Sequence, residues 1–340
     1  MKTISHSAKL ASSSANATQQ VAKSAAVKSV GQRKLQSTID NSPRQAMQKG
    51  LNLMRGAIQL KGPRTLSTTD SFAEEKHGKV YKTTTAKKAQ VWVKIENPED
   101  VGKVQAASDF ITGFSSKIAG NPKWKINTPT IREATSAEAQ ILIANSIGNS
   151  ASRFTIATSA LATDKPDEYE TSSMADKSYF KALGKMQLMD IVMGNVDRGI
   201  GLYNPENYKV DGKSHTISMI DNVDAGKLEL SGFGDKRDLL TTLKNGSRDE
   251  LKALLRSEQY FMYADTYNDL IRNEDFMDAY IDGMLKARKK LPKFLKKMES
   301  FHDKSSNPEY KTAMSVMLDN ARSIIPSVPA KAGKYIFGIG

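Results

Sequence analysis

The sequence predicts an α+β protein with an N-terminal tail, a small β-rich part containing one helix, and a larger helical part. Three observations carry this prediction. No aromatic residue precedes Phe72, apolar and polar residues alternate between residues 77 and 98, and helical apolar stripes run from about residue 236 to 325. The chain of 340 residues suffices for one two-lobed domain plus a tail, or for two small domains.

Residues 1–70 are predicted to be a disordered basic leader, because they are rich in Ser, Ala, Gln and Lys and bury too little apolar surface to offset chain entropy. They hold 11 Lys and Arg and two acids, so about +9 of the formal net charge of +13 lies there. The body is mildly basic, and we expect no specific nucleic-acid partner. Apolar spacing between Ser42 and Leu60 predicts a short helix that docks on the body or binds a secretion chaperone.

The absence of cysteine fits a reducing compartment, or an exported protein that avoids oxidation. No apolar run reaches the roughly 18 residues of a transmembrane helix, and the N-terminus lacks the apolar core of a signal peptide. Its acid-poor, Ser- and Ala-rich composition resembles the leader of a bacterial protein exported by a type III or similar machine, although a mitochondrial presequence is similar in composition. We expect secretion by a bacterium into a host cell.

The β-rich part begins with a predicted hairpin. Val80 and Thr83, and then Val91 and Val93, alternate with polar residues until Pro98 ends the pattern. A helix is expected at 135–150, with Thr135 or Ser136 as N-cap and Gly148 as C-cap.

The second half of the chain begins after a further strand at 152–162. A polar linker at 162–176 precedes an apolar helix at 178–195, a strand at 215–220 and the helices after residue 236. We place the β-rich part at 71–165 and the helical part at 166–330, with a cleft where the linker joins them.

Two carboxylates each follow an apolar element. Asp197 comes after the helix and the Gly194-Asn195 turn, and Asp221 ends the strand 215–220. In phosphoryl transfer, an acid in the first position accepts a proton from the attacking hydroxyl, and one in the second holds Mg²⁺ against phosphate oxygens. Taken singly, each also fits ordinary Asp-Asn turn chemistry.

A lysine and a glutamate complete the predicted site. Lys94 ends the apolar run Val-Trp-Val, and Glu138 lies on the next predicted helix, away from its Ile stripe. Such a pair can aim an ammonium at nucleotide phosphates. The turn at His77, Gly78 and Lys79 is a candidate phosphate loop, although it contains a single glycine.

The motifs "DIVMGNVDRG" and "SMIDN" resemble the catalytic and metal-binding loops of the phosphatidylinositol 3-/4-kinase-like superfamily. The likeness is strongest to type II phosphatidylinositol 4-kinases and to the actin-fragmin kinase group, and is specific over residues 190–225. It implies a two-lobed protein-kinase-like fold, with a β-rich N-lobe and a helical C-lobe, that uses ATP and Mg²⁺. It also implies Lys94 on the phosphates, Glu138 holding Lys94, Asp197 as catalytic acid/base and Asp221 on the metal.

The chain departs from that pattern at three positions. Leu202 stands where the family places an Asn as second metal ligand, so Asn204 or Asn207 would have to substitute, and we favour Asn204. Gly199 follows Asp-Arg where many relatives have His. A catalytically inactive pseudokinase that acts as a host-protein binding module is therefore the alternative to an active kinase.

The acceptor of the expected kinase stays open between a host protein hydroxyl and a phosphoinositide. The basic run 286–297, with Leu291, Phe294 and Leu295 interleaved, fits either a peripheral membrane contact or a solvated helix face. The four His residues are scattered, which argues against a His-based metal site. A basic tail on an unrelated, nucleic-acid-binding body is a third reading of the chain.

Overall fold

The structure is a computed structural model. It describes residues 63–83, 89–118, 123–160, 162, 165–166, 176–195, 197–198, 207–226, 237–257 and 273–326. These residues form an α+β arrangement of two sheets and eight helices, so the predicted class is confirmed. The leader up to residue 62, its expected helix and most of the expected linker lie outside the described residues.

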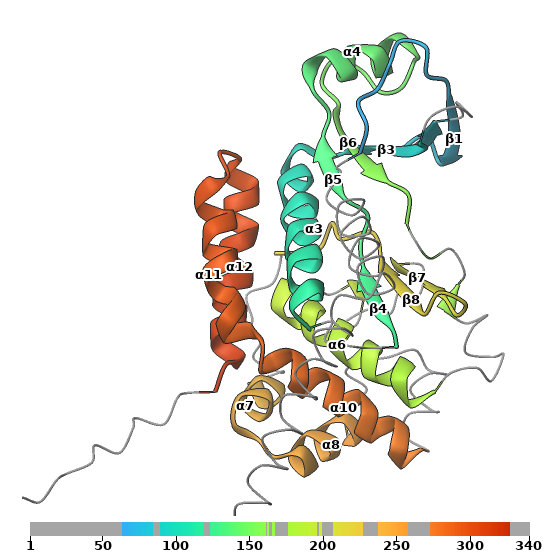
Figure 1. Cartoon of the computed structure of the whole chain (residues 1–340). Coiled ribbons are helices and arrows are strands. Elements are labelled where there is room, and N and C mark those ends of the chain that lie inside the picture. The colour runs from blue at the N-terminus through green and yellow to red at the C-terminus, as the bar shows by residue number, and fades with distance from the viewer. Residues whose placement is uncertain are drawn as a thin grey trace, which may run out of the picture. The chain divides into compact units, whose positions relative to one another are not determined.

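A five-stranded antiparallel sheet contains the predicted hairpin (Figure 1). Its order is β1 (Phe72–Lys76), β2 (Val80–Thr83), β3 (Val91–Glu96), β6 (Arg153–Thr158) and β5 (Ile131–Glu133). The strands predicted on either side of residues 84–90 and at 152–162 are therefore confirmed.

One face of this sheet packs on α4 (Ser136–Ala144). Alternate residues of a strand face opposite sides, so Val91 and Val93 are buried in a cluster that includes Leu142 of α4. Thr135 caps the helix, as predicted. The helix ends at Ala144, with Asn145 as C-cap in place of the expected Gly148, which adopts a positive φ of 67° in the turn that follows.

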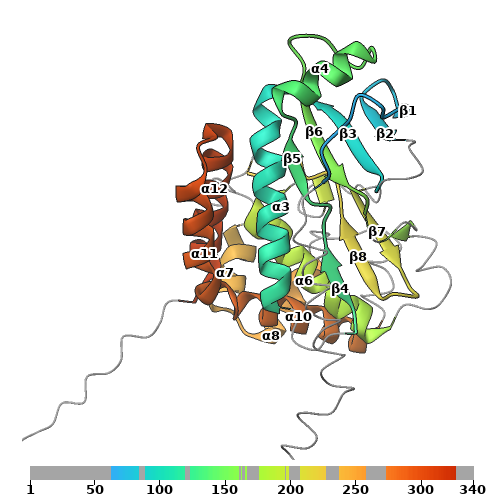
Figure 2. The same cartoon turned by 45° about the horizontal axis from the view of Figure 1, so that its top comes forward.

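A 21-residue helix that the sequence analysis missed follows β3 directly. This helix, α3 (Pro98–Ile118), has Pro98 at its first position and Glu99 and Asp100 in its first turn, which are favoured at a helix N-terminus. Figure 2 shows α3 between the strands β5 and β6 and the C-terminal helix α12 (Pro308–Ile324).

The second sheet has the order β4 (Lys125–Asn127), β8 (Thr216–Met219) and β7 (Tyr208–Asp211). Strands β4 and β8 are parallel, whereas β7 and β8 are antiparallel. The predicted apolar helix is α6 (Lys177–Met193), with Asp176 as N-cap and Gly194 in the left-handed conformation at its C-terminus.

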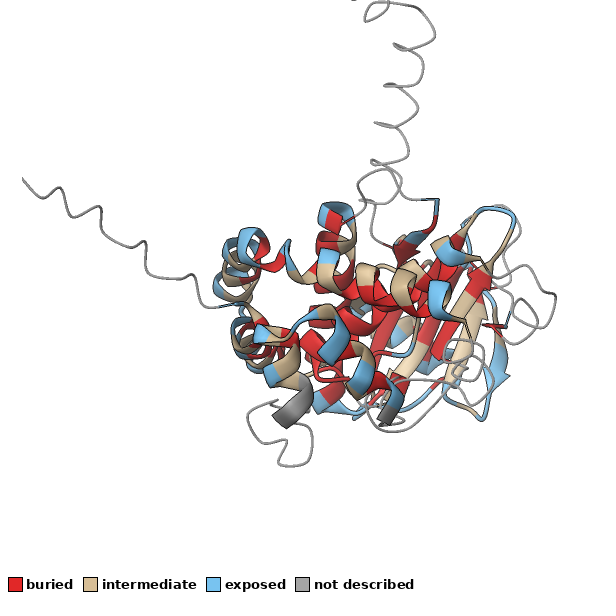
Figure 3. Ribbon diagram, turned by 90° about the horizontal axis from the view of Figure 1, so that it is seen from below, coloured by how far each residue is buried: buried red, intermediate tan, exposed pale blue. Residues whose placement is uncertain are grey.

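The remaining helices are α7 (Arg237–Asn245), α8 (Arg248–Ser257), α10 (Glu274–Arg288) and α11 (Leu291–Lys304), as the stripes predicted. Helices α6 and α10 approach closely at Gly184. A Cβ added there would overlap the carbonyl oxygen of Tyr280 on α10, so the approach requires glycine. Figure 3 shows buried residues concentrated between the helices and sheets. None of the described helices is long and apolar enough to cross a membrane.

The basic run 286–297 spans the junction of α10 and α11. Leu291 and Phe294 are fully buried, and the Phe294 ring packs against Phe110 and Phe114 of α3. These apolar side chains belong to the core and are not presented to a lipid surface.

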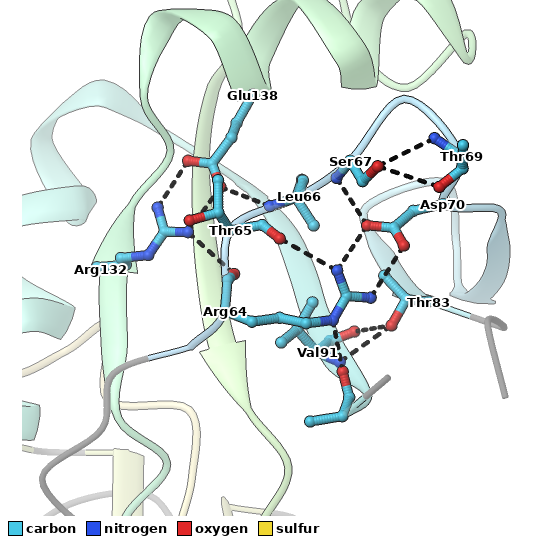
Figure 4. Close-up of polar contacts among 11 residues, drawn as sticks. Arg64, Thr65, Leu66, Ser67, Thr69, Asp70, Thr83, Val91, Arg132 and Glu138 are labelled. Carbon is cyan, nitrogen blue, oxygen red and sulfur yellow. Dashed lines mark hydrogen bonds and ion pairs between the residues drawn. The ribbon is translucent and has the colours of Figure 1, made fainter. Parts of the chain in front are cut away.

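Residues 63–70, which the sequence placed in the leader, instead contact the sheet and α4 (Figure 4). Arg64 donates to the Asp70 carboxylate at 2.6 Å, and the Leu66 amide donates to Glu138 at 2.8 Å. The buried Glu138 carboxylate also accepts both terminal nitrogens of Arg132, at 2.7 and 2.6 Å. Glu138 thus joins β5, α4 and this segment.

Acid should weaken the fold through Glu138. Burial alone would raise its pKa, but the Arg132, Thr135 and Leu66 donors outweigh burial and lower the pKa from 4.5 to about 2. A lowered folded-state pKa stabilises the fold above the unfolded value, and this stability is lost as pH falls from 4.5 towards 2. We expect Glu138 to contribute about 3 kcal/mol to that loss.

Urea titrations between pH 7 and pH 2 test this expectation. The free energy of unfolding of Glu138→Gln should lie below that of the native chain at pH 7 and converge with it near pH 2. Glu75→Gln, at an exposed position of β1, controls for the loss of one acid. If the free energies of unfolding of the native chain and of Glu138→Gln changed in parallel with pH, the lowered pKa assigned to Glu138 would be contradicted.

Candidate functional site

Asp197 is held by two asparagines. The Asn195 Oδ1 accepts the Asp197 backbone N–H at 3.1 Å, and the Asn207 Nδ2 donates to Asp197 Oδ2 at 2.7 Å. Asn195 and Asn207 are both buried, whereas Asp197 is half-buried. The carboxylate is therefore fixed at the C-terminal end of α6 without being sealed from solvent.

Arg198, the next residue, is buried and donates hydrogen bonds to several parts of the chain. Its guanidinium donates to both oxygens of Asp190 on α6, at 3.1 and 2.6 Å. It also donates to the carbonyls of Asn207 and Ile220, at 3.0 and 2.8 Å, and to Asn222 Oδ1 at 2.8 Å. Three segments distant in sequence are fixed relative to one another by this one side chain.

Burial and charge act in opposite directions on Asp190. Complete burial raises the pKa of its carboxyl group, and the charge and hydrogen bonds of Arg198 oppose this. With both side chains fully buried, each charge depends on the other for compensation.

Asp221 follows β8 in a left-handed backbone conformation, with φ of 49°. Such strain in a non-glycine residue persists only where surrounding contacts enforce it, and it clusters at functional sites. The adjacent Ile220 carbonyl accepts from Arg198, and the Ile220 amide donates to the Asn207 carbonyl at 2.9 Å. The Asp221 side chain is 42% exposed and is available to a ligand.

Lys94 reaches Asp221 from β3. Its Nζ lies 3.0 Å from Asp221 Oδ1 and 3.5 Å from Glu96 Oε2. Burial lowers the pKa of Lys94, but the Asp221 and Glu96 carboxylates more than offset it, so the net pKa is raised. Burial raises the pKa of Glu96, against the opposing effects of Lys94 and of the Thr155 hydroxyl.

The expected ion pair between Lys94 and Glu138 is wrong. Glu138 is the third residue of α4 and forms a capping box with Thr135. Helix α4 covers the face of the sheet opposite to the one that carries Lys94, so the two side chains cannot meet. Glu96 takes the expected place of Glu138, because residues two apart on a strand share a face.

The sequence contained a signal for the capping role of Glu138 and a signal for the pairing of Glu96 with Lys94. The spacing Thr135-Ser-Ala-Glu138 is that of a capping box, and Glu96 lies two residues after Lys94 in the same predicted strand.

The turn at Gly78 and Lys79 does not form an open phosphate loop. His77 and Gly78 both have positive φ, at 48° and 67°, as in a two-residue hairpin turn. The Gly78 amide donates to Glu74 Oε1 at 2.6 Å, and the Lys79 amide donates to the Lys76 carbonyl at 3.0 Å. Both amides are therefore already engaged.

The residues expected to hold a metal supply oxygen ligands, which Mg²⁺ prefers. Within the described part of the chain, no cluster of three or more His, Cys, Asp or Glu residues forms a metal cage. Mg²⁺ is usually bound through one or two carboxylates together with substrate phosphates and water, and Asp221 and Asp197 suit that mode. Asn204 lies outside the described residues, whereas Asn207, the other candidate, contacts Asp197.

The comparisons with family models and with curated proteins identify no relative of this chain. No model of a protein family matches the chain, and a search of curated proteins finds no significant match. The kinase resemblance therefore rests on the sequence motifs.

Breaking the buried pair should strongly destabilise the fold. Arg198→Met leaves the Asp190 charge uncompensated, and we expect the free energy of unfolding to fall by about 3–5 kcal/mol. Arg322→Met is the matched control, because Arg322 forms an exposed pair with Glu299 and should contribute below about 1 kcal/mol. Urea denaturation measures the free energy of unfolding of both variants. Equally small losses of this free energy in Arg198→Met and Arg322→Met would refute the structural importance of Arg198.

Proposed function

We propose that this protein is an ATP- and Mg²⁺-dependent phosphotransferase with a two-lobed, protein-kinase-like fold. The observation that carries the proposal is the 3.0 Å contact between Lys94 on β3 and Asp221 after β8. Residues 127 positions apart meet there, and the Arg198 contacts tie Asp221 to the loop that holds Asp197.

The order of the elements supports this proposal. In protein kinases, the phosphate-binding lysine lies on the third strand of a small β-rich lobe, in a Val-Ala-Ile-Lys motif. Here Lys94 ends Val-Trp-Val-Lys on the third strand of a five-stranded sheet. The helix α3 that follows β3 carries no partner for Lys94 among the described residues, and Glu96 supplies that carboxylate from β3 itself.

Each site residue has a role in this proposal. Lys94, oriented by Glu96, binds nucleotide phosphates, and Asp221 provides the carboxylate for the metal. Asp197, oriented by Asn195 and Asn207, accepts the proton of the acceptor hydroxyl. Mg²⁺, when bound with ATP, neutralises phosphate charge, and catalysis of this kind depends mainly on positioning.

The acceptor in this proposal is a host protein hydroxyl or a phosphoinositide. The secretion of the protein by a bacterium into a host cell is part of the proposal, and the composition of residues 1–70 supports it.

A catalytically inactive, protein-binding kinase fold is the second candidate. The engaged amides of Gly78 and Lys79 favour it, since they remove a phosphate contact that an active kinase of this type would use.

Phosphoryl transfer from γ-labelled ATP tests the proposal. Native protein with Mg²⁺ should label either a host-lysate protein or a phosphoinositide vesicle. Asp197→Asn should reduce the labelling rate by at least about 100-fold, because it removes the proton acceptor. Asp221→Asn should abolish labelling through loss of the metal ligand.

Asp211→Asn is the matched control, because Asp211 is the last residue of β7 and its carboxylate accepts from Ser214; it should label as the native protein does. Equal labelling by all variants would contradict the assigned roles. Absence of label from native protein that still binds ATP would favour the inactive binding module.

A further inference from the structure

The face of the five-stranded sheet that carries Lys94 also carries a row of apolar residues. Trp92 pairs with Ala157 on β6, and Ala157 pairs with Ile131 on β5, so the three lie side by side. All three are only partly buried. None belongs to, or packs against, either hydrophobic cluster of the described residues.

Trp92 is the prominent member of this row. The only other tryptophan, Trp124, is 2% exposed and packs against Tyr179 in the helical core. A partly exposed indole on a sheet face, without core neighbours, leaves apolar and π surface available to a planar ligand.

Two lysines flank the indole. Lys82, its cross-strand partner, holds Nζ 5.3 Å from the ring centroid. Lys94 lies two residues further along β3, which corresponds to roughly 6–7 Å along a strand. The surface therefore joins an aromatic platform to positive charge, which complements a ligand with a planar ring at one end and a polyanion at the other.

We propose that Trp92 is the platform on which the purine ring of the nucleotide stacks, with the phosphates directed along β3 towards Lys94. This inference rests on the proposed function and adds the residue that recognises the base. Lys82 approaches the indole, and the part of the indole that stays exposed is available to the purine ring. Stacking on an aromatic side chain is worth enough to change affinity by about tenfold or more per base.

Calorimetric titration with MgATP and with inorganic tripolyphosphate separates base from phosphate recognition. Trp92→Ala should weaken ATP binding about tenfold and leave tripolyphosphate binding unchanged, whereas Trp92→Phe should retain most of the ATP affinity. Lys94→Ala should weaken both ligands. Thermal melting establishes that each variant is folded.

Tryptophan fluorescence provides a readout that does not depend on the alanine variant. ATP should quench the native emission, tripolyphosphate should not, and Trp92→Phe should lose the quench because Trp124 is buried. ATP binding that is equal or tighter in Trp92→Ala would overturn the platform while leaving the proposed function intact. Equal weakening of both ligands by Trp92→Ala would show a merely structural role. Failure of native protein to bind either ligand would overturn the proposed function as well.

Discussion

The Arg198 guanidinium and the Asp190 carboxylate form a fully buried ion pair that the geometry of the candidate site depends on. Removing two charges from water costs several kcal/mol per ion, and apolar residues of similar volume often stabilise a fold equally well. The pair is therefore better explained by what it positions. The same guanidinium holds the carbonyls before β7 and after β8, and so sets Asp197 and Asp221 relative to each other.

The two faces of the five-stranded sheet make different contacts. Val91 and Val93 pack on α4 from one face, and the buried Glu138 network fastens residues 63–70 to the same side. The other face carries Trp92, Lys94 and Glu96, and Lys94 pairs there with Glu96 and Asp221. The strained backbone of Asp221 meets this second face through Lys94.

Local signals explain which parts could be predicted from the sequence. Alternation predicted the hairpin of β2 and β3, and the Thr135 cap fixed the start of α4, because both depend on near neighbours. Helix α3 was missed since its buried positions include Gly102 and Gly113, which allow close approach to Tyr310 and Phe294 and weaken the apolar stripe. Glu138 was given the wrong partner because the sequence does not show which face of the sheet α4 covers; only the tertiary structure does. The role of Arg198 was missed although Asp190, a charge within an apolar helix, requires a partner.

The proposed function requires Asp197 and Asp221 to face one metal–nucleotide site. Electron paramagnetic resonance of Mn²⁺, a surrogate for Mg²⁺ at oxygen ligands, measures that site directly. We expect native protein to immobilise Mn²⁺ when ATP is present, and we expect Asp221→Asn to abolish this signal while Asp211→Asn preserves it. A Mn²⁺ signal with native protein and ATP that equals the signal of ATP and Mn²⁺ alone, or an unchanged signal in Asp221→Asn, would contradict a shared metal–nucleotide site.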